Sequence, residues 1–139
     1  VTGVQTCALP ISLYPSITNE LGREALRWFL ETRMRDIPKH TRDLIFEVII
    51  FVIEHNYVEC WMGGTIHVFR QIIGTAMGLS ISVSYAIIVM IYVENRIIKD
   101  ARRKKWITHY GRFIDDMILG WKGTKEELLE FRRRFLRMH

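Results

Sequence analysis

Two neighbouring carboxylates, Asp115 and Asp116, are the residues of this sequence best suited to chemistry. They join two short runs rich in β-branched and aromatic residues, Trp106–Ile114 and Met117–Trp121. Such runs predict a strand, a turn and a second strand, with the acids at the turn. Adjacent carboxylates repel each other, and a divalent cation bound to both relieves that repulsion. The pair therefore predicts a metal site, although the same pair also occurs in ordinary turns that bind nothing.

Charge is the second feature of the sequence that indicates a partner. The chain has 139 residues, enough for one domain with a core, and a formal net charge of +5. Its basic residues gather in two runs near the C-terminus: Arg102, Arg103, Lys104 and Lys105, then Arg132, Arg133, Arg134 and Arg137. Clustered cations are typical of nucleic-acid contact, and equally of solvated helix faces. The two cysteines, Cys7 and Cys60, form no disulfide framework and fit an intracellular protein.

The first eleven residues, 1–11, carry no charge and show no useful periodicity. They resemble the translation of a sequencing-library adapter along their whole length. We therefore expect a foreign leader at 1–11 and treat 12–139 as a partial domain, cut at both ends.

The elements that must position the acids are predicted from residue patterns. Helical spacing of apolar residues predicts helices at 19–34, 40–55, 79–101 and 125–138. Thr41 is the predicted cap of the second of these, and Thr124 with Glu127 forms a predicted capping box for the last. Gly63-Gly64 predicts a tight turn in a hairpin at 57–69. Residues 12–14 are expected to form the end of a strand that runs into a turn at Pro15.

Two competing interpretations arise from the same stretches. No charged residue lies between Gln71 and Val93, so Ile72 to Val93 is long enough to cross a bilayer. Its serines and glycines lower its hydrophobicity, and we expect no membrane partner. His55, Cys60 and His67 suggest zinc only weakly, because they lack the spacing of paired ligands.

Three segments together resemble the reverse-transcriptase motifs A, B and C, in that order. The matching residues are Ser12-Leu13-Tyr14, then Gln71-x-x-Gly74-Thr75-Ala76-Met77-Gly78, then Phe113-Ile114-Asp115-Asp116. The GTAMG wording, Tyr85-Ala86 and Trp121-x-Gly123 are most similar to the Penelope-like element branch. The resemblance covers Ser12 to about Phe135. One departure is Ser82-Val83, which stands where the family usually has a proline after a small residue.

The resemblance implies an α+β fold: a polymerase palm-type antiparallel sheet with helices packed on one face, plus partial fingers. It implies RNA-directed DNA polymerisation with two Mg²⁺ ions, or Mn²⁺ in their place, held by Asp115 and Asp116 together with a motif A acid. That acid is expected at position 9, where this chain has Leu9, so we expect the chain itself to be inactive. Nucleotide and template contacts are implied for Tyr14, Gln71, Gly74, Thr75, Ala76, Met77 and Gly78.

The implied partners are an RNA template, a DNA primer and deoxynucleoside triphosphates, in the nucleus if the host is eukaryotic. Nucleic-acid contact is further expected at Arg102, Arg103, Lys104 and Lys105. Two rivals stay open, namely a membrane protein and a non-catalytic, nucleic-acid-binding relative of the palm.

Overall fold

The chain forms a mixed α and β structure in a computed structural model that describes residues 3–8, 13–76, 78–113 and 116–136. It divides into two compact units, 1–13 with 90–139, and 14–89. We call the first the sheet unit and the second the helical unit. The predicted α+β class is confirmed at this level.

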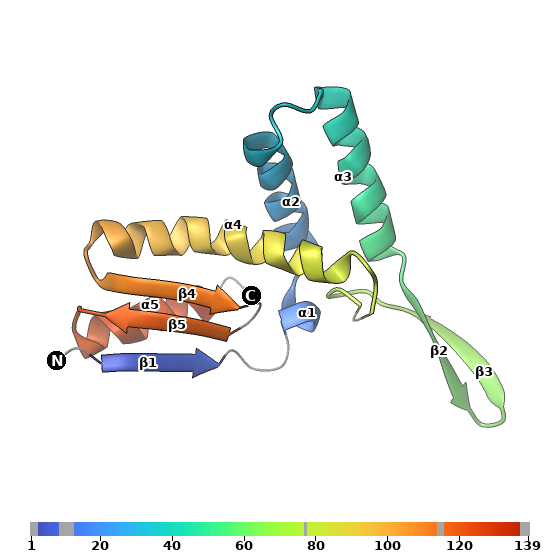
Figure 1. Cartoon of the computed structure of the whole chain (residues 1–139). Helices are drawn as coiled ribbons and strands as arrows, with labels where there is room; N and C mark the ends of the chain where they lie inside the picture. The colour runs from blue at the N-terminus through green and yellow to red at the C-terminus, as the bar shows by residue number, and fades with distance from the viewer. Residues whose placement is uncertain (1–2, 9–12, 77, 114–115, 137–139) are drawn as a thin grey trace. The chain divides into compact units, whose positions relative to one another are not determined.

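The sheet unit contains a three-stranded antiparallel sheet in the order β1–β5–β4 (Figure 1). Its strands are β1 (Gly3–Ala8), β4 (Ile107–Phe113) and β5 (Asp116–Trp121). Both predicted strands of the acidic hairpin are present, and β5 is the central strand, hydrogen-bonded on both sides. Three strands with one covered face are what a small sheet needs for stability.

One face of this sheet is covered by two helices, α4 (Ser82–Arg103), whose residues 90–103 belong to this unit, and α5 (Lys125–Leu136). The ring of Trp121, 6% exposed, lies 5.4 Å from that of Phe131 on α5. Tyr110 on β4 donates a hydrogen bond to Glu94 on α4. Residues 110, 117, 119 and 121 share this face because side chains alternate along paired strands. The prediction that helices pack on one face of the sheet is therefore confirmed.

Residues 12–14 were expected at the end of a strand, and this prediction is wrong. Leu13–Ser16 forms a short helix, α1, and the strand beside the acidic hairpin is Gly3–Ala8 instead. Pro15 suits the first turn of a helix, where its missing N–H is not needed. The edge strand β1 therefore consists of residues from the expected foreign leader. Strands pair through backbone hydrogen bonds, so this pairing requires no particular side chains. Ser12 lies outside the described residues.

The helical unit is built on α2 (Asn19–Arg33) and α3 (Lys39–Glu54), close to the predicted bounds. Thr18 caps α2, accepting from the Leu21 N–H at 3.2 Å. The predicted cap of α3 is wrong: Pro38 is its N-cap, and no side chain caps it. Ion pairs join the two helices, Arg23 to Glu54 at 2.6 Å and Arg27 to Asp43 at 3.0 Å.

Helical spacing predicts that Leu21, Ala25, Trp28 and Phe29 form the buried stripe of α2, and the structure differs from this in part. Leu21, Trp28 and Phe29 are only half-buried, whereas the residues of α2 with the least exposure are Gly22, Ala25, Leu26 and Leu30. Gly22 has a particular reason to be glycine: a Cβ there would lie 1.9 Å from the hydroxyl oxygen of Tyr85. The same spacing predicts that α5 buries Leu128, Leu129, Phe131 and Phe135. Phe131 and Phe135 are buried, but Leu129 is 42% exposed.

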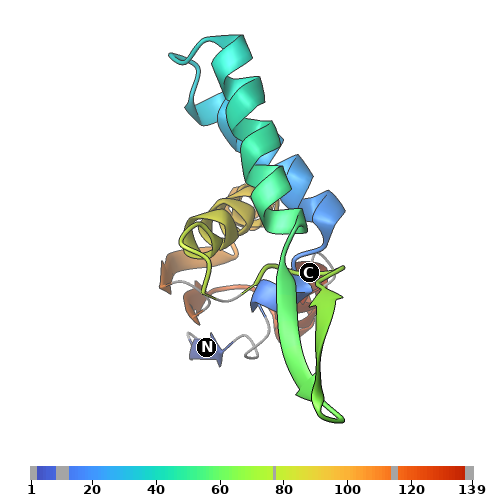
Figure 2. The same cartoon turned by 90° about the vertical axis from the view of Figure 1, so that its right-hand side faces the viewer.

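The predicted hairpin at 57–69 is confirmed as β2 (Tyr57–Met62) and β3 (Thr65–Arg70), a separate two-stranded sheet seen in Figure 2. Gly63 and Gly64 have φ of +58° and +83°, which explains the glycine pair at its turn. Within the described part of the chain, no three His, Cys, Asp or Glu residues gather as metal ligands. Among the described helices none has the length and apolarity to cross a membrane.

We predict that Gly22→Ala destabilises the protein by about 1–3 kcal/mol, although alanine favours helices. Tyr85 is 2% exposed and has no room to move away from the added methyl group. Chemical denaturation measures the loss. Gly22→Ala combined with Tyr85→Phe should recover part of it, because the closest clashing atom is then gone.

The matched control is Gly111→Ala, since a Cβ at Gly111 meets no atom within 4 Å. Equal losses at Gly22 and Gly111 would contradict the packing argument.

Candidate functional site

Asp116 is the first residue of the central strand β5, and its side chain is exposed. Its backbone faces Phe113 on β4 and Ala8 on β1. Phe113 and Ile118, which share the uncovered face of the sheet with Asp116, are 76% and 53% exposed. The acid is therefore fixed at its backbone and open to a ligand at its carboxylate. Asp115 lies outside the described residues.

A carboxylate on α4 supports the hairpin that carries this acid. Glu94 Oε1 accepts hydrogen bonds from the Tyr110 hydroxyl and from Arg112 Nε, both on β4. The Arg112 and Glu94 side chains are only 12% and 16% exposed, so water screens the ion pair weakly. The Tyr110 hydroxyl also lies 3.5 Å from Met117 Sδ, on the strand that starts at Asp116. Glu94 thus holds β4 near its end, and the contact between Tyr110 and Met117 joins β4 to β5.

The protonation of Tyr110 follows from this packing. Burial is the main cause that raises its pKa above the ordinary value, and the hydrogen bond to the Glu94 carboxylate raises it further. Tyr110 therefore stays neutral and keeps donating to Glu94 throughout the physiological pH range.

The end of β1 directly precedes position 9, where the resemblance implies an acid. Ala8, the last residue of β1, pairs with Asp116. Position 9 is the next residue along the chain, with its Cα about 3.8 Å from that of Ala8 in any trans peptide. Leu9 itself lies outside the described residues. A carboxylate introduced at position 9 would come directly after Ala8 in the chain, and Ala8 pairs with Asp116.

The glycine-containing loop in the helical unit packs on the backbone of α1. Gly74 has a φ of +84°, and a Cβ there would lie 2.7 Å from the Cα of Pro15. The Thr75 N–H donates to the carbonyl of Tyr14 at 2.8 Å. Gly74 is thus required for its backbone conformation and for close approach. The backbone of Tyr14 fixes the loop, while its ring is exposed to an intermediate degree.

This loop lines a cavity of about 540 Å³ within the helical unit. The lining residues are Pro15, Asn56, Tyr57, Val58, Gln71, Thr75, Ala76, Gly78 and Leu79. Four of the residues predicted for nucleotide and template contact are therefore neighbours around one space. A fifth, Met77, lies outside the described residues.

Thr75 is the most informative of these residues. It is 2% exposed, and its hydroxyl has no hydrogen-bond partner among the described residues. A buried hydroxyl without a partner costs about 1–3 kcal/mol, so the Thr75 hydroxyl is a local cost to the folded chain beside the cavity. By contrast, Gln71 Nε2 donates to the Ile73 carbonyl at 2.9 Å, and Ser82 Oγ donates to the Ala76 carbonyl at 2.5 Å.

The first basic run ends α4, and an acid upstream neutralises part of it. Arg102 is exposed, and the side chain of Arg103 lies outside the described part. Lys104 Nζ is 3.6 Å from Asp100 and 4.4 Å from the ring centroid of Trp106. Lys105, with φ +58°, terminates the helix. Only part of this run is thus left to meet an anion.

The second run behaves similarly. Arg132 and Arg133 are exposed on α5, while Arg134 Nη1 lies 3.1 Å from Asp100 Oδ2. Sequence reasoning missed Asp100 as the shared partner of both runs. It also missed Glu94, the first charged residue after the apolar stretch that ends at Val93.

Comparisons with known proteins identify no relative of this chain. No protein-family model matches it, no curated protein matches its sequence, and no solved structure matches its fold.

We predict that Thr75→Val leaves stability unchanged or raises it by up to about 1 kcal/mol, since the lost hydroxyl has no partner. Ser82→Ala, the matched control, should cost about 1 kcal/mol because Ser82 loses its bond to the Ala76 carbonyl. Denaturant unfolding of both variants measures the difference. A large loss of stability in Thr75→Val would mean that its hydroxyl is satisfied within the protein.

Proposed function

We propose that this chain carries the palm of an RNA-directed DNA polymerase and part of its fingers. The observation that supports this most is the pairing of Ala8 with Asp116. Ala8 directly precedes the position expected to carry the motif A acid, and Asp116 is the second of the expected motif C acids. Three carboxylates at that corner would form the acidic centre of nucleotidyl transfer.

The donor chemistry of the corner fits Mg²⁺ in part. Asp115 and Asp116 supply hard carboxylate oxygens, which Mg²⁺ prefers, and the exposed Asp116 side chain is accessible to solvent. Leu9 supplies none. Mg²⁺, or Mn²⁺, would favour ionisation of the primer 3′-hydroxyl and offset the charge of the triphosphate.

The chain's own residues have separate tasks in this proposal. Asp115 and Asp116 would hold the metal, and Glu94 supports the hairpin that carries them through Tyr110 and Arg112. The cavity at Thr75 takes a polar atom of the nucleotide or of the template. Tyr14 contacts the incoming sugar and selects deoxynucleotides.

The partners follow from these roles. An RNA template, a DNA primer and deoxynucleoside triphosphates are all polyanions, and the chain's net charge of +5 favours binding to them. Arg102, Arg132 and Arg133, all exposed, are cations of the two runs that are available for backbone contact in this proposal.

A second candidate function is nucleic-acid binding without catalysis. Leu9 favours it, because an apolar side chain at the expected acid leaves the corner with two carboxylates. Both candidate functions have a nucleic acid as the partner. They differ in whether the protein catalyses formation of a phosphodiester bond.

Substituting Leu9 tests the proposal. Leu9→Asp should bind Mn²⁺ about tenfold more tightly than the unchanged chain, by calorimetry, since a further carboxylate joins the pair. It should also extend a DNA primer on an RNA template with Mg²⁺. Leu9→Asn is the matched control, having nearly the same size without the charge.

The outcomes separate the two candidates. Metal binding without extension by Leu9→Asp would favour the non-catalytic binder. Equal Mn²⁺ affinities of the Leu9→Asp and Leu9→Asn variants would overturn the acidic centre. It would also be overturned if Leu9→Asp still raised the Mn²⁺ affinity after Asp115→Asn had been added.

A further inference from the structure

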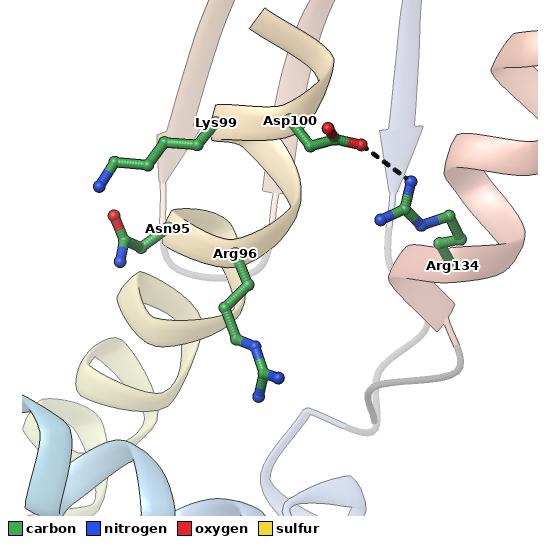
Figure 3. Close-up of a pocket in the computed structure, with 5 residues that line it drawn as sticks. All are labelled: Asn95, Arg96, Lys99, Asp100 and Arg134. Atoms are coloured by element: carbon green, nitrogen blue, oxygen red, sulfur yellow. Dashed lines mark hydrogen bonds and ion pairs between the residues drawn. The ribbon is translucent and has the colours of Figure 1, made fainter. Parts of the chain in front are cut away.

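A second cavity, of about 610 Å³, lies on the sheet unit and is lined by α4 and α5. Its lining residues are Asn95, Arg96, Lys99, Asp100 and Arg134. Figure 3 shows the first four projecting from α4, with Arg134 reaching from α5 toward Asp100. The volume is in the range of pockets that hold small ligands, and three of the five side chains are cationic.

The cations that line this pocket outnumber its carboxylates. Asp100, its one carboxylate, already lies 3.1 Å from Arg134 Nη1 and 3.6 Å from Lys104 Nζ. Lys99 is exposed and has no ion-pair or hydrogen-bond partner within the described part of the chain. The ion pair to Asp100 also holds the Arg134 guanidinium at the wall of the pocket.

We propose that this pocket binds a phosphate group, supplied by the backbone of a nucleic-acid strand. Guanidinium and ammonium groups are the standard protein donors to phosphate oxygens, and the Asn95 amide can donate as well. The lining cations come from two helices, Arg96 and Lys99 from α4 and Arg134 from α5, whereas a solvated helix face presents them along one. The contact would be independent of base sequence, because only backbone charge is recognised.

The site is separate from the acids of β5. Its polynucleotide partner rests on the proposed function, but its charges do not depend on catalysis. Inorganic triphosphate carries the same chemistry and is the alternative source of the phosphate group.

The experiment measures binding of the whole chain to a fluorescent single-stranded RNA at several salt concentrations, with EDTA present. Lys99→Gln should weaken binding about threefold and lower the salt slope by about 0.7, the share of one phosphate contact. Lys125→Gln is the matched control, an exposed lysine on α5 outside the pocket. Lys99→Arg should retain binding. Circular dichroism checks that each variant is folded.

Inorganic triphosphate is titrated into the same variants. If Lys99→Gln weakens RNA binding and Lys125→Gln does not, the proposal stands with a backbone phosphate. If only triphosphate binding depends on Lys99, the phosphate chemistry stands and its source is the free anion. Equal effects of the two substitutions, or no effect of Lys99→Gln on either ligand, would overturn the pocket. Because no metal is present, this failure would leave the acidic centre untouched.

Discussion

The candidate site depends on keeping neighbouring carboxylates in place despite their mutual repulsion. β5 is suited to this as the central strand, because its backbone is hydrogen-bonded on both sides from Asp116 onward. Glu94 adds a side-chain constraint by accepting from Tyr110 and Arg112 at low exposure. A weakly screened ion pair is costly to break, so Glu94 restrains β4 at Arg112, one residue before Phe113, which pairs with Asp116. That rigidity is what preorganised metal binding requires.

The loop that contains Gly74 and Thr75 in the helical unit is also held in place by contacts with its neighbours. Gly74 permits contact with Pro15, and the Tyr14 carbonyl fixes the following residue, so Thr75 is buried beside a cavity. Its unsatisfied hydroxyl is a local cost to the folded chain. Each unit thus holds one polar feature that its own residues leave incomplete: an acidic corner in one, a buried hydroxyl in the other.

Periodic and local signals in the sequence predicted most elements. Both hairpins, the helices at 19–34 and 125–138, and the Thr124–Glu127 capping box are present, the box with bonds of 2.7 and 3.2 Å. The strand predicted at residues 12–14 is wrong. Three residues before a proline fit the end of a strand as well as the start of a helix, so the local sequence does not distinguish the two. The role of Glu94 could not be derived, since its partners lie 16 and 18 residues away. Likewise, no local pattern reveals that Asp100 neutralises cations of two separate runs.

The central claim is that the acids at the head of β5 bind a divalent cation. Paramagnetic broadening by Mn²⁺ in the amide NMR spectrum of the unchanged chain tests it most directly. The account predicts that, at the lowest Mn²⁺ concentration, signals of Ala8, Phe113 and Asp116 broaden first. Another adjacent acid pair, Glu126 and Glu127 in the first turn of α5, is the internal comparison. Broadening that begins there, or that spreads evenly over the chain, would contradict a metal site at the hairpin.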